Sequence, residues 1–207
     1  MNPILEQIAQ ISIVPVIAIE DAAAAPALAR ALLAGGLPVA EVTFRTAAGE
    51  EAIRCIVEEV PEMLVGAGTV LNVAQAEQAM RAGAKFIVSP GLDEGTVRFC
   101  QQNGLPVFPG CATPTEMQAA LNLGLTYLKF FPAEQAGGLA YLKAVSAAYP
   151  VLRFMPTGGI GPKNLREYLA FEKIFACGGS WMCPKDLISA GDWETIMQLC
   201  KEARELR

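Results

Sequence analysis

A strand-like segment followed by a helix-like segment recurs eight times along this chain of 207 residues. The strand-like segments are short apolar runs rich in β-branched and aromatic residues. They occupy Ile13–Ile19, Val39–Phe44, Met63–Ala67, Phe86–Ser89, Pro106–Pro109, Tyr127–Phe131, Leu152–Pro156 and Ile174–Cys177. Successive runs begin roughly 23 residues apart, which is the length that a strand, a helix and two short loops need. This alternation restricts the folds open to the chain more than any other feature.

The segments between these runs have the apolar spacing of helices. They cover Ala22–Leu33, Glu50–Val60, Val73–Ala82, Glu94–Asn103, Pro114–Leu123, Leu139–Ala148 and Pro162–Phe171, and a last helix spans Trp193–Glu205. Several are followed by glycine, where a left-handed residue commonly ends a helix: Gly35-Gly36, Gly83, Gly104 and Gly124. Pro114 and Pro162 stand where the first turn of a helix accepts proline.

Several of the apolar runs are continuous rather than alternating, which is typical of parallel strands covered on both faces. Strict alternation without a linker predicts an α/β fold. We expect a (β/α)8 TIM barrel formed as a single domain by residues 1–207, with an N-terminal helix and a C-terminal helix. An open doubly wound sheet is the alternative. Eight units in so few residues leave no spare segment for edge strands, so the barrel is favoured.

The composition excludes several classes of protein. Hydrophobic residues make up 53% of the chain and charged residues 18%, so the chain is not disordered. No apolar stretch reaches the about 18 residues that a membrane span needs. The net charge of -5, with no block of either sign, argues against nucleic acid or a membrane as a partner. The N-terminus lacks the basic segment and cleavage site of a signal peptide, which predicts a cytoplasmic protein.

The chain contains no histidine. This excludes catalytic triads that use imidazole and zinc sites with histidine ligands. The six cysteines are scattered without a CxxC pair, which predicts reduced, packed thiols rather than a structural metal site. Any catalysis must therefore use amines, guanidinium groups, carboxylates, hydroxyls, thiols or the backbone.

One lysine stands out. In barrels of this kind the active site lies at the carboxyl ends of the strands. Of the seven lysines, Lys129 alone falls inside a predicted strand, next to Leu128 and Phe130. Burial favours the neutral amine over the ammonium, and a neutral amine attacks carbonyls to form a Schiff base. The alternative is a lysine at a strand end that extends to solvent or pairs with a carboxylate.

The second predicted strand carries polar residues at alternate positions. Glu41, Thr43 and Arg45 are separated by apolar residues, so strand geometry points all three toward one face. If that face looks into the barrel mouth, Glu41 can transfer protons and Arg45 can bind a substrate carboxylate through two hydrogen bonds. The alternative, an exposed edge strand with a surface ion pair, conflicts with the apolar neighbours.

Glycine-rich segments follow three strands, at Gly66–Thr69, Thr157–Gly159 and Gly178–Ser180. The last two occupy the position where barrels of this kind bind phosphate, because backbone N–H groups and a helix N-terminus can surround an anion there. Either segment alone is consistent with a simple turn. Two of them in consecutive units, the second including the hydroxyl of Ser180, predict a phosphorylated ligand.

These residues belong to a longer series of segments. In chain order they are Glu41–Thr46, Val65–Leu71, Ser89–Gly91, Pro109-Gly110 with Thr113–Glu116, Lys129–Glu134, Pro156–Ile160 and Gly178–Trp181. In this register the series resembles the KDPG/KHG aldolases, class I enzymes for 2-keto-3-deoxy-6-phosphogluconate (KDPG) and 4-hydroxy-2-oxoglutarate (KHG). The resemblance runs from the first predicted strand to the region after the eighth.

The resemblance implies a lyase of the Entner-Doudoroff pathway that reversibly cleaves KDPG to pyruvate and glyceraldehyde 3-phosphate, and KHG to pyruvate and glyoxylate. It implies that Lys129 forms the Schiff base and that Glu41 is the general acid and base. The other implied site residues bind substrate: Arg45 and Thr69 at the pyruvate carboxylate, Pro90 and Phe131 along the pocket, Thr157 at the aldehyde, and Gly158, Gly159, Gly179 and Ser180 at the phosphate.

The resemblance also implies a homotrimer whose partners are a phosphorylated keto sugar acid and pyruvate. No metal and no other cofactor is expected, because a covalent imine supplies the polarisation that a zinc ion supplies elsewhere. Two alternatives stay open. One is a sister aldolase for 2-keto-3-deoxy-6-phosphogalactonate. The other is a non-catalytic phosphate-ligand-binding barrel in which Lys129 is a paired structural residue.

Overall fold

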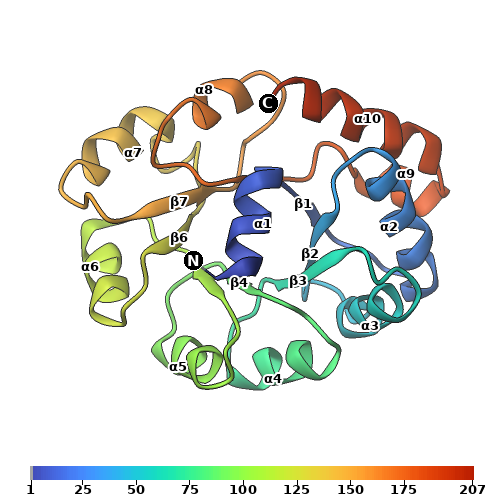
Figure 1. Cartoon of the computed structure of the whole chain (residues 1–207), viewed down its shortest axis with the longest axis horizontal. Coiled ribbons are helices and arrows are strands. Elements are labelled where there is room, and N and C mark those ends of the chain that lie inside the picture. Colours follow the sequence, from blue (N-terminus) through green and yellow to red (C-terminus); the bar gives the residue numbers. More distant parts are fainter. Residues whose placement is uncertain (1) are drawn as a thin grey trace.

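Parallel strands alternate with helices throughout the structure, a computed structural model that describes residues 2–207 (Figure 1). The strands are β1 Ile13–Ile17, β2 Val39–Thr43, β3 Leu64–Gly68, β4 Ile87–Ser89, β5 Val107–Pro109, β6 Tyr127–Phe130, β7 Arg153–Pro156 and β8 Cys177–Gly179. The helices are α1 Pro3–Ile11, the short 3-10 helix η1 Ala22–Ala24, α2 Ala25–Ala34, α3 Gly49–Glu59, α4 Val73–Arg81, α5 Glu94–Gln102, α6 Pro114–Asn122, α7 Gly138–Ser146, α8 Leu165–Leu169, α9 Lys185–Ala190 and α10 Trp193–Glu205.

The strands form a curled parallel sheet of the TIM-like type. Six of them are ordered β5-β4-β3-β2-β1-β8, and β6 pairs with β7 in a second sheet. Isolated parallel bridges, Gly110 to Lys129 and Thr157 to Gly178, lie between the two sheets. The first and eighth strands are direct neighbours, with Val14 opposite Gly178. This order rules out the doubly wound alternative, in which the strand order reverses at a switch point.

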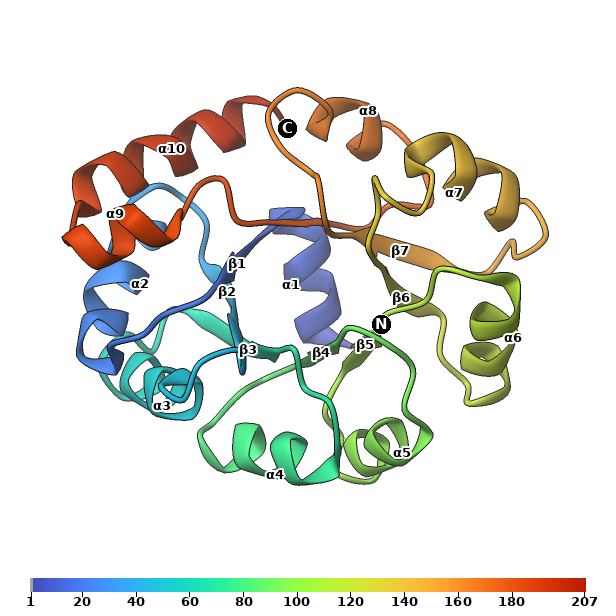
Figure 2. The same cartoon turned by 180° about the vertical axis from the view of Figure 1, so that it is seen from behind.

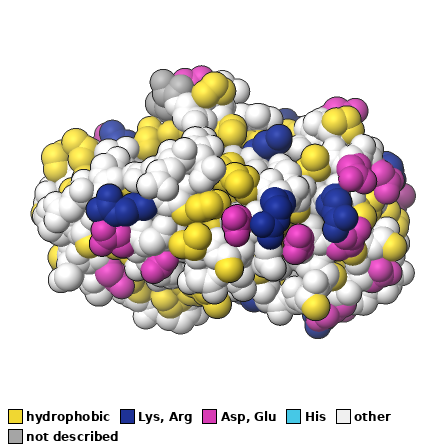
Figure 3. Space-filling model, turned by 90° about the horizontal axis from the view of Figure 1, so that it is seen from below, with side chains coloured by type: hydrophobic (Ala, Val, Ile, Leu, Met, Phe, Trp, Pro, Cys, Tyr) yellow, Lys and Arg dark blue, Asp and Glu magenta, His cyan; other side chains and the backbone are white. Residues whose placement is uncertain are grey.

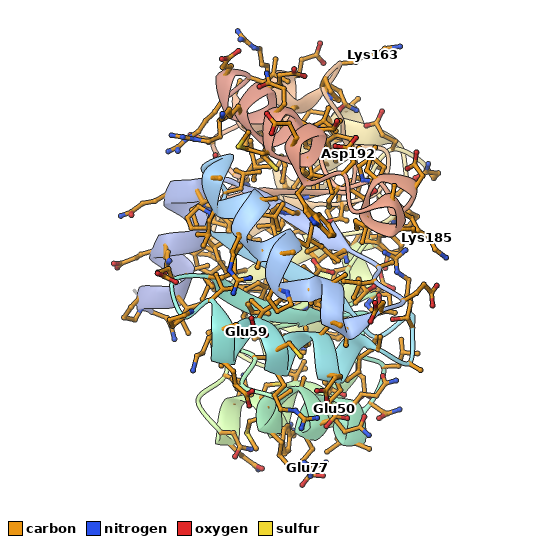
Figure 4. All side chains as sticks on the ribbon, turned by 90° about the vertical axis from the view of Figure 1, so that its right-hand side faces the viewer. Glu50, Glu59, Glu77, Lys163, Lys185 and Asp192 are labelled. Atoms are coloured by element: carbon orange, nitrogen blue, oxygen red, sulfur yellow. The ribbon has the colours of Figure 1, made fainter. Side chains whose placement is uncertain are left out.

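Helices surround the strands in an outer ring, whereas α1 lies across the middle of that ring (Figures 1 and 2). Leu5 and Ile8 of α1 are buried against a cluster that includes Phe86, Phe108 and Phe175. In the side view α1 projects at one end of the strands, and the labelled Glu50 and Lys185 lie toward the other end (Figure 4). Because those residues lie in the first turns of α3 and α9, the end away from α1 is where the strands finish and the helices start.

Strands β1 to β7 begin and end within two residues of the predicted runs. Strand β8 starts later than predicted, because Phe175 and Ala176 pack in the cluster beneath α1 while Gly178 and Gly179 pair with β1. Helix α8 begins at Leu165 rather than Pro162. The six-residue helix α9 is absent from the prediction, since so short a segment shows no helical period.

Helix ends follow the predicted chemistry at several points. Gly36, Gly83, Gly104 and Gly124 all adopt positive φ after a helix. Pro114 is the first residue of α6, behind a capping box made by Thr113 and Glu116. These signals are local, which is why the sequence predicts them well.

The outer surface carries charges of both signs. Arg81 pairs with Glu77 on α4, and Arg98 pairs with Glu94 on α5. On the face formed by these two helices, basic and acidic side chains lie beside one another and neither sign gathers into a patch (Figure 3). None of the helices formed by residues 2–207 combines the length and the apolar character that a membrane span requires.

Candidate active site

A cavity of about 270 Å³ opens at the carboxyl ends of the strands, and we call it the strand-end cavity. All eleven site residues expected from the sequence line it: Glu41, Arg45, Thr69, Pro90, Lys129, Phe131, Thr157, Gly158, Gly159, Gly179 and Ser180. They belong to six of the strands, β2, β3, β4, β6, β7 and β8, or to the loops that follow them. Its size is near the lower limit for small-molecule sites, which suits a ligand of a few carbon atoms.

Lys129 and Glu41 form a buried pair at the floor of this cavity. The Lys129 side chain is 6% exposed and that of Glu41 is fully buried, and Lys129 Nζ lies 3.5 Å from Glu41 Oε1. The other carboxylate oxygen, Oε2, finds no hydrogen-bond partner within residues 2–207. Glu41 therefore has one oxygen near the amine and one available to a ligand.

The Glu41 carboxylate owes its position to a glycine on the neighbouring strand. Glu41 lies opposite Gly66 in the register of β2 and β3, and its side chain reaches over Gly68. A Cβ atom added at residue 68 would collide with Oε1 of Glu41. The small residues in β3 therefore make room for the acid inside the sheet.

Arg45 lies just beyond β2 and is exposed at the cavity. Its Nε donates to Thr43 Oγ1 at 3.1 Å, and the Thr43 hydroxyl donates in turn to the Ile17 carbonyl at 2.7 Å. No carboxylate among the described residues forms an ion pair with Arg45. The surface ion pair considered for Glu41 and Arg45 is absent from residues 2–207, since Glu41 faces Lys129 instead. The anchored guanidinium can accept an anion.

Thr69 adopts a left-handed backbone conformation with φ of 54°. Such a conformation is a clear outlier for a β-branched residue. Strain of this kind persists where the surrounding structure enforces it, and it gathers at binding and catalytic sites. Thr69 also lines the cavity, so its backbone and its position both mark it as a ligand-binding candidate.

The glycine-rich segments after β7 and at the end of β8 also line the cavity. Gly158 and Gly159 have φ of 99° and 78°, which a residue with a side chain adopts only under strain. Thr157 Oγ1 is buried without a hydrogen-bond partner in the described part of the chain. Helix α8 starts only at Leu165, so residues of the loop, rather than the helix N-terminus, line the cavity here.

Two apolar residues of the cavity, Val16 and Ile160, were not expected from the sequence. Val16 is one of five buried residues of β1 and resembles any core residue in the sequence. Ile160 directly follows the expected glycines, and this position is a signal by which the sequence could have identified it. Phe131 was expected, and its ring lies 5.0 Å from Lys129 Nζ.

The cysteines lie outside the cavity lining. Burial raises the pKa of the Cys111 thiol to about 12, with a smaller contribution from nearby Glu116. Among residues 2–207, no group of three or more Cys, Asp or Glu side chains is arranged to hold a metal ion. The reactive groups that the cavity offers are thus the amine, the carboxylate, the guanidinium and the hydroxyls.

Comparisons with known proteins all indicate the same family. The family model described as "KDPG and KHG aldolase" matches residues 4–199. A 2-dehydro-3-deoxy-phosphogluconate aldolase of Treponema pallidum is 45% identical over 206 residues, covering 100% of this chain and 98% of that protein.

Solved structures agree. KDPG aldolase from Legionella pneumophila, with pyruvate captured at low pH as a covalent carbinolamine intermediate, has a TM-score of 0.93 at 38% identity and covers 97% of both chains. The aldolase of Zymomonas mobilis ZM4 with 3-phosphoglycerate has a TM-score of 0.91 at 42% identity, covering 98% of this chain and 96% of that one. With a strand-end cavity that holds a buried amine and carboxylate, and with likeness over nearly its whole length, this chain belongs to the KDPG and KHG aldolase family.

Proposed function

We propose that this protein is a class I aldolase that cleaves KDPG to pyruvate and glyceraldehyde 3-phosphate, and KHG to pyruvate and glyoxylate. One observation supports this above all: the buried amine of Lys129 lies 3.5 Å from the buried carboxylate of Glu41 at the floor of an otherwise open cavity. An amine and an acid at this spacing can form and break an imine. The relative from Legionella pneumophila carries pyruvate as a carbinolamine, the intermediate expected of that chemistry.

The first half of the reaction builds an electron sink. Neutral Lys129 attacks the 2-keto carbon of the substrate, and one proton passes from the amine nitrogen to the carbonyl oxygen to give a carbinolamine. Glu41, acting as an acid, donates a proton to the hydroxyl, which leaves as water and yields an iminium ion. Arg45 and Thr69 hold the substrate carboxylate and so place the keto carbon beside Lys129.

The second half breaks the carbon–carbon bond. The Glu41 carboxylate takes the proton of the 4-hydroxyl, directly or through a water. The electron pair of the C3–C4 bond moves to C3, where the iminium nitrogen accepts it as an enamine, and the aldehyde leaves. Protonation of the enamine at C3 restores the iminium, and water then releases pyruvate and the free amine.

The outer end of the substrate meets the glycine segments. Gly158, Gly159, Gly179 and Ser180 would bind the phosphate through backbone N–H groups and a hydroxyl, with Thr157 beside the aldehyde carbons. Pro90 and Phe131 would form the side walls. The relative from Zymomonas mobilis with 3-phosphoglycerate supports a phosphorylated ligand at such a site.

The remaining properties follow the same proposal. The whole chain would be one domain, closed into a (β/α)8 barrel through the bridges that flank β6 and β7. It would act as a homotrimer in the cytoplasm, on small molecules and without a metal or other cofactor, since the imine does the polarising.

The central prediction concerns Lys129. Incubation with pyruvate followed by reduction with borohydride should leave one modified lysine, identified by peptide mass spectrometry as Lys129, because a reduced imine is stable to hydrolysis. A chelator should leave turnover of KDPG unchanged. The matched control is Lys185→Met, which removes an exposed lysine paired with Glu20 and should keep the adduct.

An unmodified protein would remove the Schiff-base mechanism and favour the non-catalytic phosphate-binding barrel. An adduct at another lysine would contradict the role of Lys129. Turnover lost to chelator and restored by metal would overturn the metal-free reaction. The rival galactonate substrate differs from KDPG at one hydroxyl, and it would be preferred if kcat/KM for 2-keto-3-deoxy-6-phosphogalactonate exceeds that for KDPG.

A further inference from the structure

Hydrogen bonds from neighbouring residues to its carbonyl groups fix the position of the loop after β7. The backbone N–H of Ala133 donates to the Thr157 carbonyl at 2.9 Å, and that of Glu134 donates to the Gly158 carbonyl at 3.1 Å. The loop after β6, which follows Lys129, is thereby joined to the loop that carries the cavity glycines.

Asn164, just before α8, holds the next part of the same loop. Its side-chain Nδ2 donates to the Gly159 carbonyl at 3.0 Å, and its Oδ1 accepts from the Gly161 N–H at 2.9 Å. One half-buried amide thus fixes two peptide groups on either side of Ile160. Asn164 does not itself line the strand-end cavity.

These bonds determine which way the loop's N–H groups point. In a planar trans peptide the C=O of one residue and the N–H of the next point in opposite directions. When Glu134 holds the Gly158 carbonyl and Asn164 holds the Gly159 carbonyl, the N–H groups of Gly159 and Ile160 point away from those donors. No acceptor for either N–H is found among residues 2–207, and both residues line the cavity.

We propose that Asn164 is a positioning residue for the substrate's phosphate group, acting through the Gly159 carbonyl to turn the Ile160 N–H toward the cavity. The inference rests on the proposed function. It extends that function by naming a residue outside the cavity that sets the preference for phosphorylated over non-phosphorylated substrates. Without Asn164 the peptide between Gly159 and Ile160 is free to rotate, because glycine at 159 tolerates many backbone conformations.

The experiment compares two substrates that share the pyruvate end. KDPG carries a phosphate and KHG does not, so loss of a phosphate contact separates them. In Asn164→Ala, KM for KDPG should rise about tenfold to a hundredfold, the effect of losing a hydrogen bond to a charged group, with little change in kcat. Both parameters for KHG should stay within about twofold. The inhibition constant of inorganic phosphate, measured with KHG as substrate, should rise with the KM for KDPG.

Two further variants keep the test decisive. Asn164→Ser keeps a small polar residue favoured at the N-cap position of α8, where the Asn164 side chain makes no capping bond, but it is too short to bond both peptide groups. It should therefore reproduce the substrate split even if the alanine variant folds poorly. Asn103→Ala removes a similar bond, from Asn103 Nδ2 to the Phe99 carbonyl at 2.9 Å, at the end of α5, and should change neither substrate.

Equal losses on KDPG and KHG would show a purely structural role and overturn the proposal, as would unchanged KM for KDPG in both Asn164 variants. A wild-type protein that cleaves neither substrate would instead contradict the proposed function, so the two failures are distinguishable.

Discussion

At the scale of single residues, the reactive groups depend on neighbours that have no chemistry of their own. Glu41 can sit inside the sheet because residue 68 lacks a side chain. The sequence points to Glu41 and Lys129, since polar residues inside apolar strands are unusual, and to Arg45, which continues the alternation of β2 just beyond its end. It does not reveal the role of Gly68, because Gly66–Thr69 is equally typical of an ordinary loop. Contacts between strands, which local pattern does not encode, explain that gap.

The Gly68→Ala variant tests this dependence. Its added methyl group should displace the Glu41 carboxylate from Lys129, so kcat for KDPG should fall toward the value of Glu41→Gln, about 10²- to 10⁴-fold below wild type. Overpacking should also cost about 1–3 kcal/mol of unfolding free energy, measured by urea denaturation.

The control is Gly95→Ala in α5, where an added Cβ would meet ordinary contacts of 3.4 Å to Asp93 and 3.5 Å to Val73. It should keep wild-type kcat. Wild-type turnover in Gly68→Ala, in a protein that is folded by circular dichroism, would show that Glu41 does not need the space.

At the scale of elements, local signals predicted most of the helices well, but they missed α9 and predicted the last strand poorly. The start of α6 is the clearest case, with Thr113 and Glu116 satisfying each other's backbone N–H groups. Strand β8 is the opposite case: two of its three residues are glycine, and its pairing with β1 requires a partner from the other end of the chain. Only its pairing with β1 makes a strand of that segment.

The capping box of α6 predicts a pH dependence of stability. Partial burial acts to raise the pKa of Glu116, but hydrogen bonds from the N–H groups of Ala112 and Thr113 and from the Thr113 hydroxyl outweigh it, so the pKa is lowered. A carboxyl with a lowered folded-state pKa stabilises the fold above its unfolded pKa, about 4.3, and loses that contribution as pH falls through the folded value.

The free energy of unfolding of the Glu116→Gln variant should therefore be about 1 kcal/mol lower than that of wild type at pH 7. This difference lowers Tm by about 2–4 °C in a chain of this size. The difference from wild type should shrink as pH falls below about 4, as seen in thermal melts at a series of pH values. Glu167→Gln on α8, an exposed position, is the control and should melt like wild type at every pH. A difference between Glu116→Gln and wild type that is constant with pH would contradict the assignment.

At the scale of the whole molecule, the eightfold alternation is enough to predict the parallel α/β architecture, while assembly depends on surface that the pattern does not describe. Leu71 is 56% and Val73 39% exposed beside the cavity loops, although both are large apolar residues. Nothing in their spacing separates an interface from an isolated exposed side chain. The homotrimer therefore remains an expectation from family resemblance.

Light scattering during gel filtration tests that expectation. The molar mass should be three times the 22.0 kDa of the chain and should stay constant on dilution through the working concentration range. A mass of one or two chains would contradict the trimer. That result would leave the proposed chemistry intact, since every cavity residue named above belongs to the same chain.

Helix α1 and the aromatic cluster close the amino end of the strands. This closure affects the order in which the two products leave. Because that end is closed, substrate and products enter and leave the strand-end cavity at the carboxyl ends of the strands. Lys129 and Glu41 are buried, whereas Gly159 and Ser180, at the proposed phosphate end, are exposed. In the proposed reaction the aldehyde lies between the mouth and the carbon fragment bound to Lys129. The aldehyde must therefore depart first and pyruvate last, which makes release sequential rather than random.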